Sequence, residues 1–453
     1  MDRFVPVKIA LGQKPLGIWG SLQAARNNVL SLIPEIATRQ PIVSGKVGVR
    51  WHMVMDPTAL RRILRDNLQN YPKSTVTKEL LRPAIGESLF IAEGAHWKWQ
   101  RQAAAPVFTH RNISNLAPIM TRAAAAATER IAQHTGRAVD LYSEMMDTTF
   151  DVISDVTFSN SDGFDRKELF KMIDTYIDST AKVSILDILG APSWVPRPSR
   201  AMIGSDIRRI KSIADRAIAS HKANKHGEAA DLLDLLEAGE DPDTKRRMTR
   251  QELRDNLLAF IVAGHETTAL TLSWALYLLS HDKDAQNRAR DEINAETRDG
   301  PIGAEHLDKL PFVRAVIDEA LRLYPPAAFV SRTALGPDRL CDRNVTAGDT
   351  VMLPFYALHR SHLYWDDPDN FRPQRFMKPN KIERFTYLPF GDGPRICIGA
   401  SFALQEAVII LATLLKRFAF TAVAGKNPEP VMILTLRPKG GVWVHVDKIN
   451  SYT

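Results

Sequence analysis

The amino-acid sequence predicts a mainly α-helical protein with small β-sheets. Apolar residues recur at helical spacing along most of the chain, and the apolar run at 257–279 is long enough to cross a whole domain. Strand signals are short and few, at residues 47–55, 350–354, 431–436 and 442–446. The Pro-Lys-Gly-Gly sequence at 438–441 separates the last two segments, so we expect a C-terminal hairpin there.

Composition places this 453-residue chain among ordinary globular proteins, and we expect one domain over residues 1–453 because no linker divides it. The net charge of +7 would suit an anionic partner, but no basic block or basic-aromatic stripe predicts a nucleic-acid site. The N-terminal residues predict neither a signal peptide nor a membrane anchor. Two cysteines, Cys341 and Cys397, are too few for a disulfide framework, so a cytoplasmic protein is expected.

The run at 257–279 predicts a buried core helix rather than a membrane span. Glu266 lies near its middle, where a carboxylate would cost roughly 3 kcal/mol in a bilayer. Thr249 and Glu252 have the spacing of a capping box and predict the start of this helix. A glutamate on an otherwise apolar helix requires a partner or a function.

The strongest signal is residues 390–399, which match F-x-x-G-x-R-x-C-x-G at every fixed position. A cysteine that ligates iron must be a thiolate, which is stabilised by backbone N–H groups that glycines allow to approach closely. The residues after Cys397 are strongly helical, so the sulfur would lie at a helix N-terminus, where the dipole favours negative charge. Cys341 has no such surroundings, and we expect it to be structural.

With this loop the chain resembles the cytochrome P450 family, and the resemblance extends from about residue 47 to 446 with the motifs in the family's order. It implies the cytochrome P450 fold, with the haem between the long oxygen-side helix and the helix after the cysteine loop. It also implies haem b as cofactor, with the Cys397 thiolate as axial iron ligand. By the same resemblance, Arg395 binds a haem propionate and Phe390 packs beside the thiolate.

Three further residues match propionate contacts of the family. Trp97 and Arg101 stand four residues apart on a predicted helix, so their N–H donors would reach one propionate from one helix face. Arg332 matches another contact. The alternative for the first pair is an amphipathic helix with a surface arginine.

The resemblance implies that Glu266 and Thr267 deliver protons to iron-bound dioxygen. Neighbouring residues on a regular helix point about 100° apart, so both would serve one site only if the helix is locally distorted, which Gly264 permits. The alternative is structural, a glutamate in a buried ion pair beside a threonine bonded back to its own helix. We expect His265 to be structural.

Glu319 and Arg322 lie three residues apart on a helix predicted at 311–324. Such pairs are usually solvated contacts worth about 0.2–0.5 kcal/mol. The resemblance implies instead that these two residues and Arg375 form a buried charge triad that supports the cysteine loop. Gln374 stands where many members of the family have an acid, outside the triad itself.

The function implied by resemblance is a monooxygenase that inserts one atom of dioxygen into a C–H or C=C bond of a lipophilic small molecule. Family position predicts a largely apolar pocket lined by residues 75–90, Ala263, residues 327–330 and residues 433–435. One alternative is a haem-thiolate enzyme that rearranges or consumes peroxides, which would not need Glu266 and Thr267. The other is a non-catalytic haem sensor, which should carry an effector module that the sequence does not display.

Electrons are expected from a ferredoxin- or flavodoxin-like partner and its reductase, because the sequence contains no convincing Gly-rich strand-turn-helix for a nucleotide. Such carriers are typically acidic. The positive charge of the chain, including Lys98 and Arg111, is therefore expected to steer their encounter.

Overall fold

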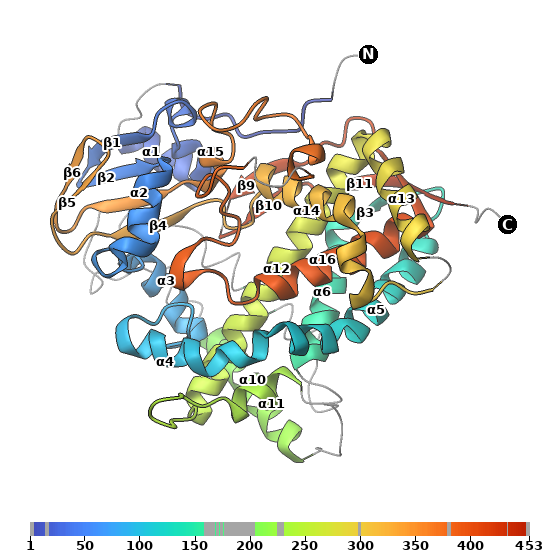
Figure 1. Ribbon diagram of the computed structural model, residues 1–453, viewed down its shortest axis with the longest axis horizontal. Helices are drawn as coiled ribbons and strands as arrows, with labels where there is room; N and C mark the ends of the chain where they lie inside the picture. The colour runs from blue at the N-terminus through green and yellow to red at the C-terminus, as the bar shows by residue number, and fades with distance from the viewer. Residues whose placement is uncertain are drawn as a thin grey trace.

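A sheet-rich side and a helical side meet along one long helix in the computed structural model (Figure 1). The structure describes residues 4–13, 18–157, 204–223, 231–297, 300–377, 382–432 and 434–449, together with residues 168, 172 and 175. Helices predominate and the sheets have two to four strands, so the predicted fold class is confirmed.

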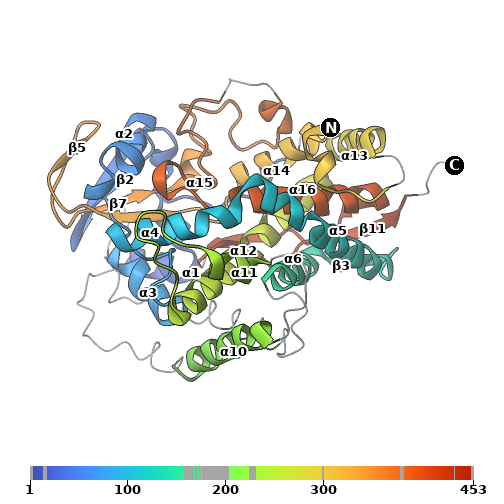
Figure 2. The same ribbon diagram turned by 60° about the horizontal axis from the view of Figure 1, so that its bottom comes forward.

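The α-helices are α1 (Ile18–Asn27), α2 (Pro57–Arg61), α3 (Thr75–Ile85), α4 (Gly94–Ala104), α5 (His110–Ala132), α6 (Leu141–Thr157), α10 (Gly204–Ala223), α11 (Leu232–Ala238), α12 (Arg250–His281), α13 (Lys283–Thr297), α14 (Pro311–Leu323), α15 (Phe355–Leu358) and α16 (Ala400–Arg417). Short 3-10 or π turns are η1 (Val29–Leu32), η2 (Glu35–Thr38), η3 (Arg62–Asp66), η4 (Leu68–Asn70), η5 (Ala105–Phe108), η6 (Ala304–Lys309), η7 (Pro373–Phe376) and η8 (Gly393–Arg395). In both ribbon views α12 runs through the middle of the molecule, whereas α10 lies at its edge (Figures 1 and 2).

The long helix α12 has the predicted start. The backbone N–H of Glu252 donates to the Thr249 hydroxyl at 3.3 Å, and the Thr249 N–H donates to the Glu252 carboxylate at 2.9 Å. This capping box satisfies two N–H groups that a helix end would otherwise leave unpaired. The helix continues without interruption to His281, which corresponds to about 48 Å at 1.5 Å per residue. Most of its apolar side chains are buried, on all sides of the helix, as a core helix requires.

Small sheets complete the fold. One has the strand order β1 (Ile42–Val47), β2 (Val49–Val54), β7 (Thr350–Leu353) and β4 (Val330–Thr333), with β2 and β7 parallel. A second contains β3 (Ala138–Asp140), β11 (Trp443–Lys448) and β8 (Phe418–Ala422). The remaining strands form two antiparallel pairs, β5 (Asp338–Leu340) with β6 (Arg343–Val345) and β9 (Glu429–Met432) with β10 (Leu436–Lys439).

The predicted C-terminal hairpin is wrong. Predicted strand 431–436 is split between β9 and β10, which pair with each other, and the next strand, β11, joins β3 and β8 instead. Gly440 and Gly441, both at positive φ, redirect the chain between the two sheets. A side chain at Gly441 would meet Asp140 at 2.7 Å, so the glycine serves a contact with a distant segment. Local turn chemistry could not reveal those distant partner strands.

The other strand predictions agree better with the structure. Segment 350–354 is β7, and segment 47–55 contains β2. The partner strand β1, which joins β2 through Gly48 at φ 68°, was not predicted. Among the described residues, no helix combines the length and apolarity needed to cross a bilayer.

Candidate active site

A cavity of about 1440 Å³ lies between α12, the cysteine loop, α3 and α4, and strand β4. Ligand pockets commonly measure about 300–1,000 Å³, so this cavity has room for more than one small molecule. The sequence predicted eight site residues, and all of them line it: Trp97, Arg101, Glu266, Thr267, Arg332, Phe390, Arg395 and Cys397. The structure therefore brings together residues that are up to 300 positions apart, from different elements.

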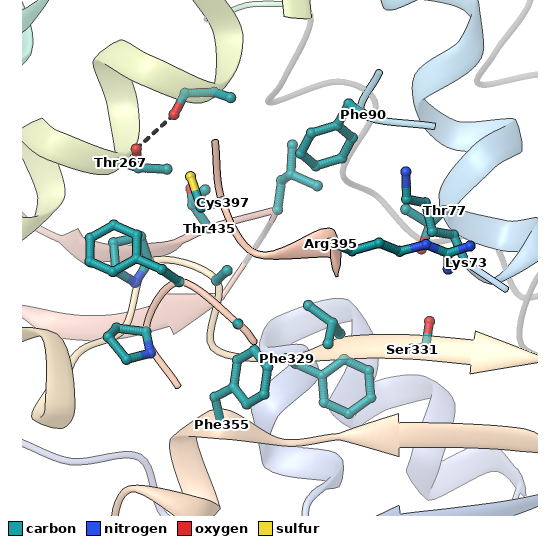
Figure 3. A pocket seen from close by; sticks show the side chains of 18 of the residues that line it. Lys73, Thr77, Phe90, Thr267, Phe329, Ser331, Phe355, Arg395, Cys397 and Thr435 are labelled. Atoms are coloured by element: carbon teal, nitrogen blue, oxygen red, sulfur yellow. Dashed lines mark hydrogen bonds between the residues drawn. The ribbon is translucent and has the colours of Figure 1, made fainter. Parts of the chain in front are cut away.

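The expected pocket segments also line the cavity where they are described. They contribute Thr75, Val76, Thr77, Leu80, Leu81, Ile85, Leu89, Phe90, Ala263, Ala327, Phe329, Val330, Leu434 and Thr435. Residue 433 lies outside the described residues. Most of these side chains are apolar, and Figure 3 shows Phe90 and Phe329 among the rings that line the space.

The cysteine loop holds Cys397 on the cavity wall. The Cys397 N–H donates to the Phe390 carbonyl at 2.9 Å, and the loop bends through Gly391 and Gly393, both at positive φ. A side chain at Gly393 would lie 2.1 Å from the Leu64 carbonyl, so only glycine fits there. The helix α16 begins three residues after the sulfur, as predicted.

Cys397 is solvent-exposed where it lines the cavity. Burial raises its pKa, while the Gly399 N–H and the positive charge of Arg101 act in the opposite direction. A cation and a backbone donor near a sulfur favour its thiolate form, which is the form that ligates iron.

Cationic side chains gather along another part of the cavity. Arg332 and Arg395 line it together with Lys73, which sequence reasoning did not select. Burial lowers the pKa of Arg332 to about 10, and Arg395 adds to this effect through like-charge repulsion. Burial also lowers the pKa of Lys73 to about 7. In Figure 3, Arg395 extends from the cysteine loop toward Lys73.

One carboxylate, Glu93, partly balances this cationic cluster. It accepts a bond from the Arg395 guanidinium and another, at 2.7 Å, from the Lys73 backbone N–H. The Nε atoms of Arg332 and Arg395 are buried and have no hydrogen-bond partner among the described residues. The Trp97 ring lies 5.7 Å from the Arg395 guanidinium carbon, within cation–π range.

These features fit a haem. Buried guanidinium groups without sufficient negative charge are costly, and two propionate carboxylates would supply the missing charge and acceptors. The sulfur lies on the same cavity, where it can reach a metal, and the apolar lining suits a macrocycle. The residues present therefore match the cofactor that the cysteine motif implies.

On α12, Glu266 and Thr267 reach the cavity but are engaged within the protein. The Thr267 hydroxyl donates to the Ala263 carbonyl at 2.6 Å (Figure 3). Glu266 is buried and accepts from Arg437 Nε at 2.5 Å and from the Thr435 hydroxyl at 2.7 Å. A buried ion pair of Glu266 and a threonine bonded back to its own helix are the contacts expected if both residues are structural. Both residues nevertheless line the cavity.

The expected distortion of α12 at Gly264 is not seen, because the helix is continuous through that position. Glu266 and Thr267 both line the cavity without it. A side chain at Gly264 would lie 3.3 Å from Ile153 on α6. The glycine therefore allows close helix packing rather than a kink. His265 is structural, as expected, with its ring bonded to the Ile261 carbonyl and set edge-on to Phe150.

The predicted charge triad is present and fully buried at its centre. Arg322 donates two bonds to Glu319, at 2.7 and 2.8 Å, and Arg375 donates a third at 3.1 Å. Arg322 also binds the His359 carbonyl at 2.7 Å. The His359 ring in turn accepts the N–H of Leu388, nine residues before the cysteine, at 2.8 Å. The triad is thereby connected to the segment that enters the cysteine loop.

Sequence reasoning missed Lys73, Glu93, Arg437 and Glu406. No spacing within a single sequence links Arg437 to Glu266, 171 residues away. Glu406 on α16 is fully buried, one of its oxygens has no partner among the described residues, and burial raises its pKa to about 8. A weaker signal existed for Glu406, because a carboxylate in the apolar α16 sequence is unusual.

Known proteins resemble this chain over nearly its whole length. The family profile described as Cytochrome P450 matches residues 11–445. A cytokinin hydroxylase of Arabidopsis thaliana is 33% identical over 380 residues, which cover 82% of this chain and 73% of that protein. Cyclooctatin synthase of Streptomyces melanosporofaciens is 28% identical over 95% of this chain and 94% of its own. The crystal structure of the cytochrome P450DA haem domain superposes with a TM-score of 0.83 at 22% identity, covering 98% of both chains.

Proposed function

The chain belongs to the cytochrome P450 family of haem monooxygenases, and from this premise we propose that Cys397 holds haem b and that the substrate is a lipophilic small molecule. One observation carries the proposal: a thiol and two guanidinium groups line the same apolar cavity, and the buried Nε atoms of both arginines have no hydrogen-bond partner among the described residues. The reaction is insertion of one oxygen atom into a C–H or C=C bond. A single domain over residues 1–453 and a cytoplasmic location complete the proposal.

The residues have distinct roles in this proposal. When bound, the haem supplies dioxygen activation, which thiolate donation assists. Arg332 and Arg395 would hold the propionates, and the Trp97 ring on α4 lies 5.7 Å from the Arg395 guanidinium carbon. Arg101, also on α4, is proposed as a further propionate donor. Phe390 packs near the sulfur and accepts the Cys397 N–H through its carbonyl at 2.9 Å. Its bulk, with the apolar lining, excludes water.

The proton path is proposed to use the Thr267 hydroxyl and the Glu266 carboxylate on the opposite wall. The Thr267 hydroxyl, held by the Ala263 carbonyl, needs only a rotation about its side-chain bond to face the cavity. Glu266 has to exchange its bonds to Thr435 and Arg437 for contact with the relay. An acid and an alcohol on the cavity wall favour a monooxygenase over an enzyme that only consumes peroxides.

The substrate class follows from the lining, which is rich in Leu, Val, Ile and Phe side chains. We propose a terpenoid, a fatty acyl chain or a steroid-like molecule, since burial of apolar area contributes about 25 cal/mol per Å². Optical titration with geraniol, dodecanoic acid and progesterone tests the three types. Binding of at least one is expected, whereas a preference for small polar ligands over all three would contradict the proposal.

Electrons are proposed to come from an acidic ferredoxin- or flavodoxin-like carrier with its reductase. Lys98 on α4 and Arg111 on α5 are both exposed, as docking residues must be. Screening shortens the Debye length from about 10 Å at 0.1 M salt to about 3 Å at 1 M. Reduction by a plant-type ferredoxin should therefore slow as salt rises.

Reconstitution tests the reaction. Product should form with NADPH, ferredoxin reductase, ferredoxin and oxygen, and not with NADPH and the purified chain alone. Turnover with NADPH and no added protein would contradict the partner proposal. Turnover supported by hydrogen peroxide but never by the carrier would show a peroxide-using enzyme instead, and ligand binding without any oxidation would show a sensor.

A further inference from the structure

Glu266 is bound from a direction that the acid–alcohol pattern does not predict. Its carboxylate accepts from Arg437 and Thr435, which lie at the edge of the β9–β10 pair. All three side chains are buried, with 1%, 9% and 8% of their surface exposed. A buried charge pair of this kind is costly to break on one side, so the contact fixes where the carboxylate lies.

The residue between these two donors, Leu436, is bonded to α12. Leu436, the residue between Thr435 and Arg437, accepts from the indole N–H of Trp274 at 3.0 Å through its carbonyl. Its N–H donates to the Pro326 carbonyl at 3.0 Å. Trp274 is itself fully buried. Thr435 directly precedes β10 and Arg437 lies within it, and both side chains bond to Glu266 on α12 from either side of this fixed point.

Thr435 and its neighbours also form part of the cavity wall. Met432, Leu434 and Thr435 line the cavity, and so does Glu266. The Thr435 hydroxyl is thus bonded to Glu266 at 2.7 Å while the residue contacts the space that a substrate would fill. A ligand that presses on Thr435 acts directly on a donor to the carboxylate.

We propose that Arg437 is a positioning residue, which holds Glu266 against β10 until a ligand contacts Thr435 on the cavity wall. Proton delivery is then linked to an occupied pocket. The inference rests on the proposed function. A ligand that must loosen the Glu266 contacts binds more weakly by the free energy needed to break them. A variant without these contacts should therefore bind the ligand more tightly.

The test compares Arg437→Gln with Arg437→Lys, which keeps the charge, and with Lys439→Gln. Lys439 is exposed, lies two residues further along β10 and pairs with Glu429 on the surface. Optical titration uses whichever of dodecanoic acid, geraniol and progesterone binds the unmodified holoenzyme. Arg437→Gln should bind it about five-fold more tightly or better and release several-fold more hydrogen peroxide per product. Arg437→Lys should lie near the unmodified enzyme, and Lys439→Gln should match it.

A merely structural role for Arg437 would weaken or leave unchanged ligand binding, and either result would overturn the inference. If Arg437→Gln does not fold, Thr435→Val, with Thr435→Ser as its conservative control, gives the same comparison.

Thermal unfolding of Glu266→Gln, Arg437→Gln and the double variant needs no ligand. The double variant should be more stable than additivity predicts, because neither partner is then stranded. Additive midpoints would overturn the inference alone, whereas absence of a thiolate-type spectrum in the unmodified protein would overturn the proposed function.

Discussion

Two buried glutamate–arginine pairs differ in how they are built and in where they lie relative to the cavity. Glu319 and Arg322 lie within one helix, away from the cavity, and the arginine has further bonds to backbone carbonyls of His359 and Pro368. Glu266 and Arg437 come from segments 171 residues apart and meet at the cavity wall. Backbone carbonyls complete the contacts of the first pair, whereas the second pair lies where a bound ligand can disturb it.

A glutamate–arginine pair can either support the backbone around it, as Glu319 and Arg322 do, or hold a carboxylate on a cavity wall, as Arg437 does for Glu266. The distinction depends on what else the pair touches. Glu319 also accepts the backbone N–H of Arg372 at 2.8 Å and a bond from Arg375, so its carboxylate has several donors outside its own helix. Glu266, in contrast, accepts from Arg437 and from the hydroxyl of Thr435, and Thr435 lines the cavity.

The largest expected effect concerns the frame pair. Glu319→Ala or Arg322→Ala leaves one buried charge without its partner, which costs about 3–5 kcal/mol and approaches the stability of many whole domains. Little haem-loaded protein should be recovered. Arg82→Ala is the control, because Arg82 pairs with Glu87 on the surface and such pairs contribute at most about 1 kcal/mol. Normal haem content and unfolding midpoints in both triad variants would show that the pair does not support the fold.

A third buried glutamate, Glu406, sharpens the comparison because no arginine or lysine is paired with it in the described structure. Burial raises its pKa to about 8, so the folded state binds this proton more tightly than the unfolded chain. The stability it contributes is present at pH 4 and is lost as pH rises toward 8. Glu406→Gln should therefore match the unmodified protein near pH 4.

Near pH 8.5, Glu406→Gln should be more stable than the unmodified protein by a few kcal/mol, since each pKa unit corresponds to about 1.4 kcal/mol. Urea unfolding at the two pH values measures this difference, and Glu429→Gln, at an exposed site paired with Lys439, should show none. A Glu406→Gln effect that is equal at both pH values would mean that the carboxyl does not titrate between them.

The smallest expected effect concerns Thr267. Thr267→Ala should still bind substrate and consume electrons, but it should release several-fold more peroxide per product, equivalent to about 1 kcal/mol in the partition between the two outcomes. Thr413→Ala is a matched control, because the Thr413 hydroxyl also bonds back along its helix, at 2.7 Å to Ile409, and does not line the cavity. Equal coupling in both variants would remove Thr267 from the proton path.

The sequence predicts well those features whose cause is local. The capping box at Thr249, the helix that begins at Pro311 and the glycine-rich cysteine loop depend on residues a few positions apart. The pairing of β9 with β10 and the bonds of Arg437 to Glu266 depend on contacts between distant segments. Such contacts follow from tertiary packing, which no periodicity in one sequence records.

The cationic cluster shows the same limit. Arg332 and Arg395 belong to recognisable motifs, but Lys73 and Glu93 were not selected because each is an ordinary charged residue in its own segment. They gain their surroundings only when Lys73 pairs with Arg332 across a β-bridge and Glu93 receives the Arg395 guanidinium.

The ferrous carbonyl spectrum tests the central claim, thiolate ligation by Cys397, most directly. The unmodified protein should show the red-shifted Soret band that marks a thiolate ligand, and Cys397→His should lose that band while the control Cys341→Ser keeps it. Haem content, measured in parallel, separates loss of the ligand from loss of the cofactor. Persistence of the red-shifted band in Cys397→His would contradict the account, because the iron would then have another thiolate.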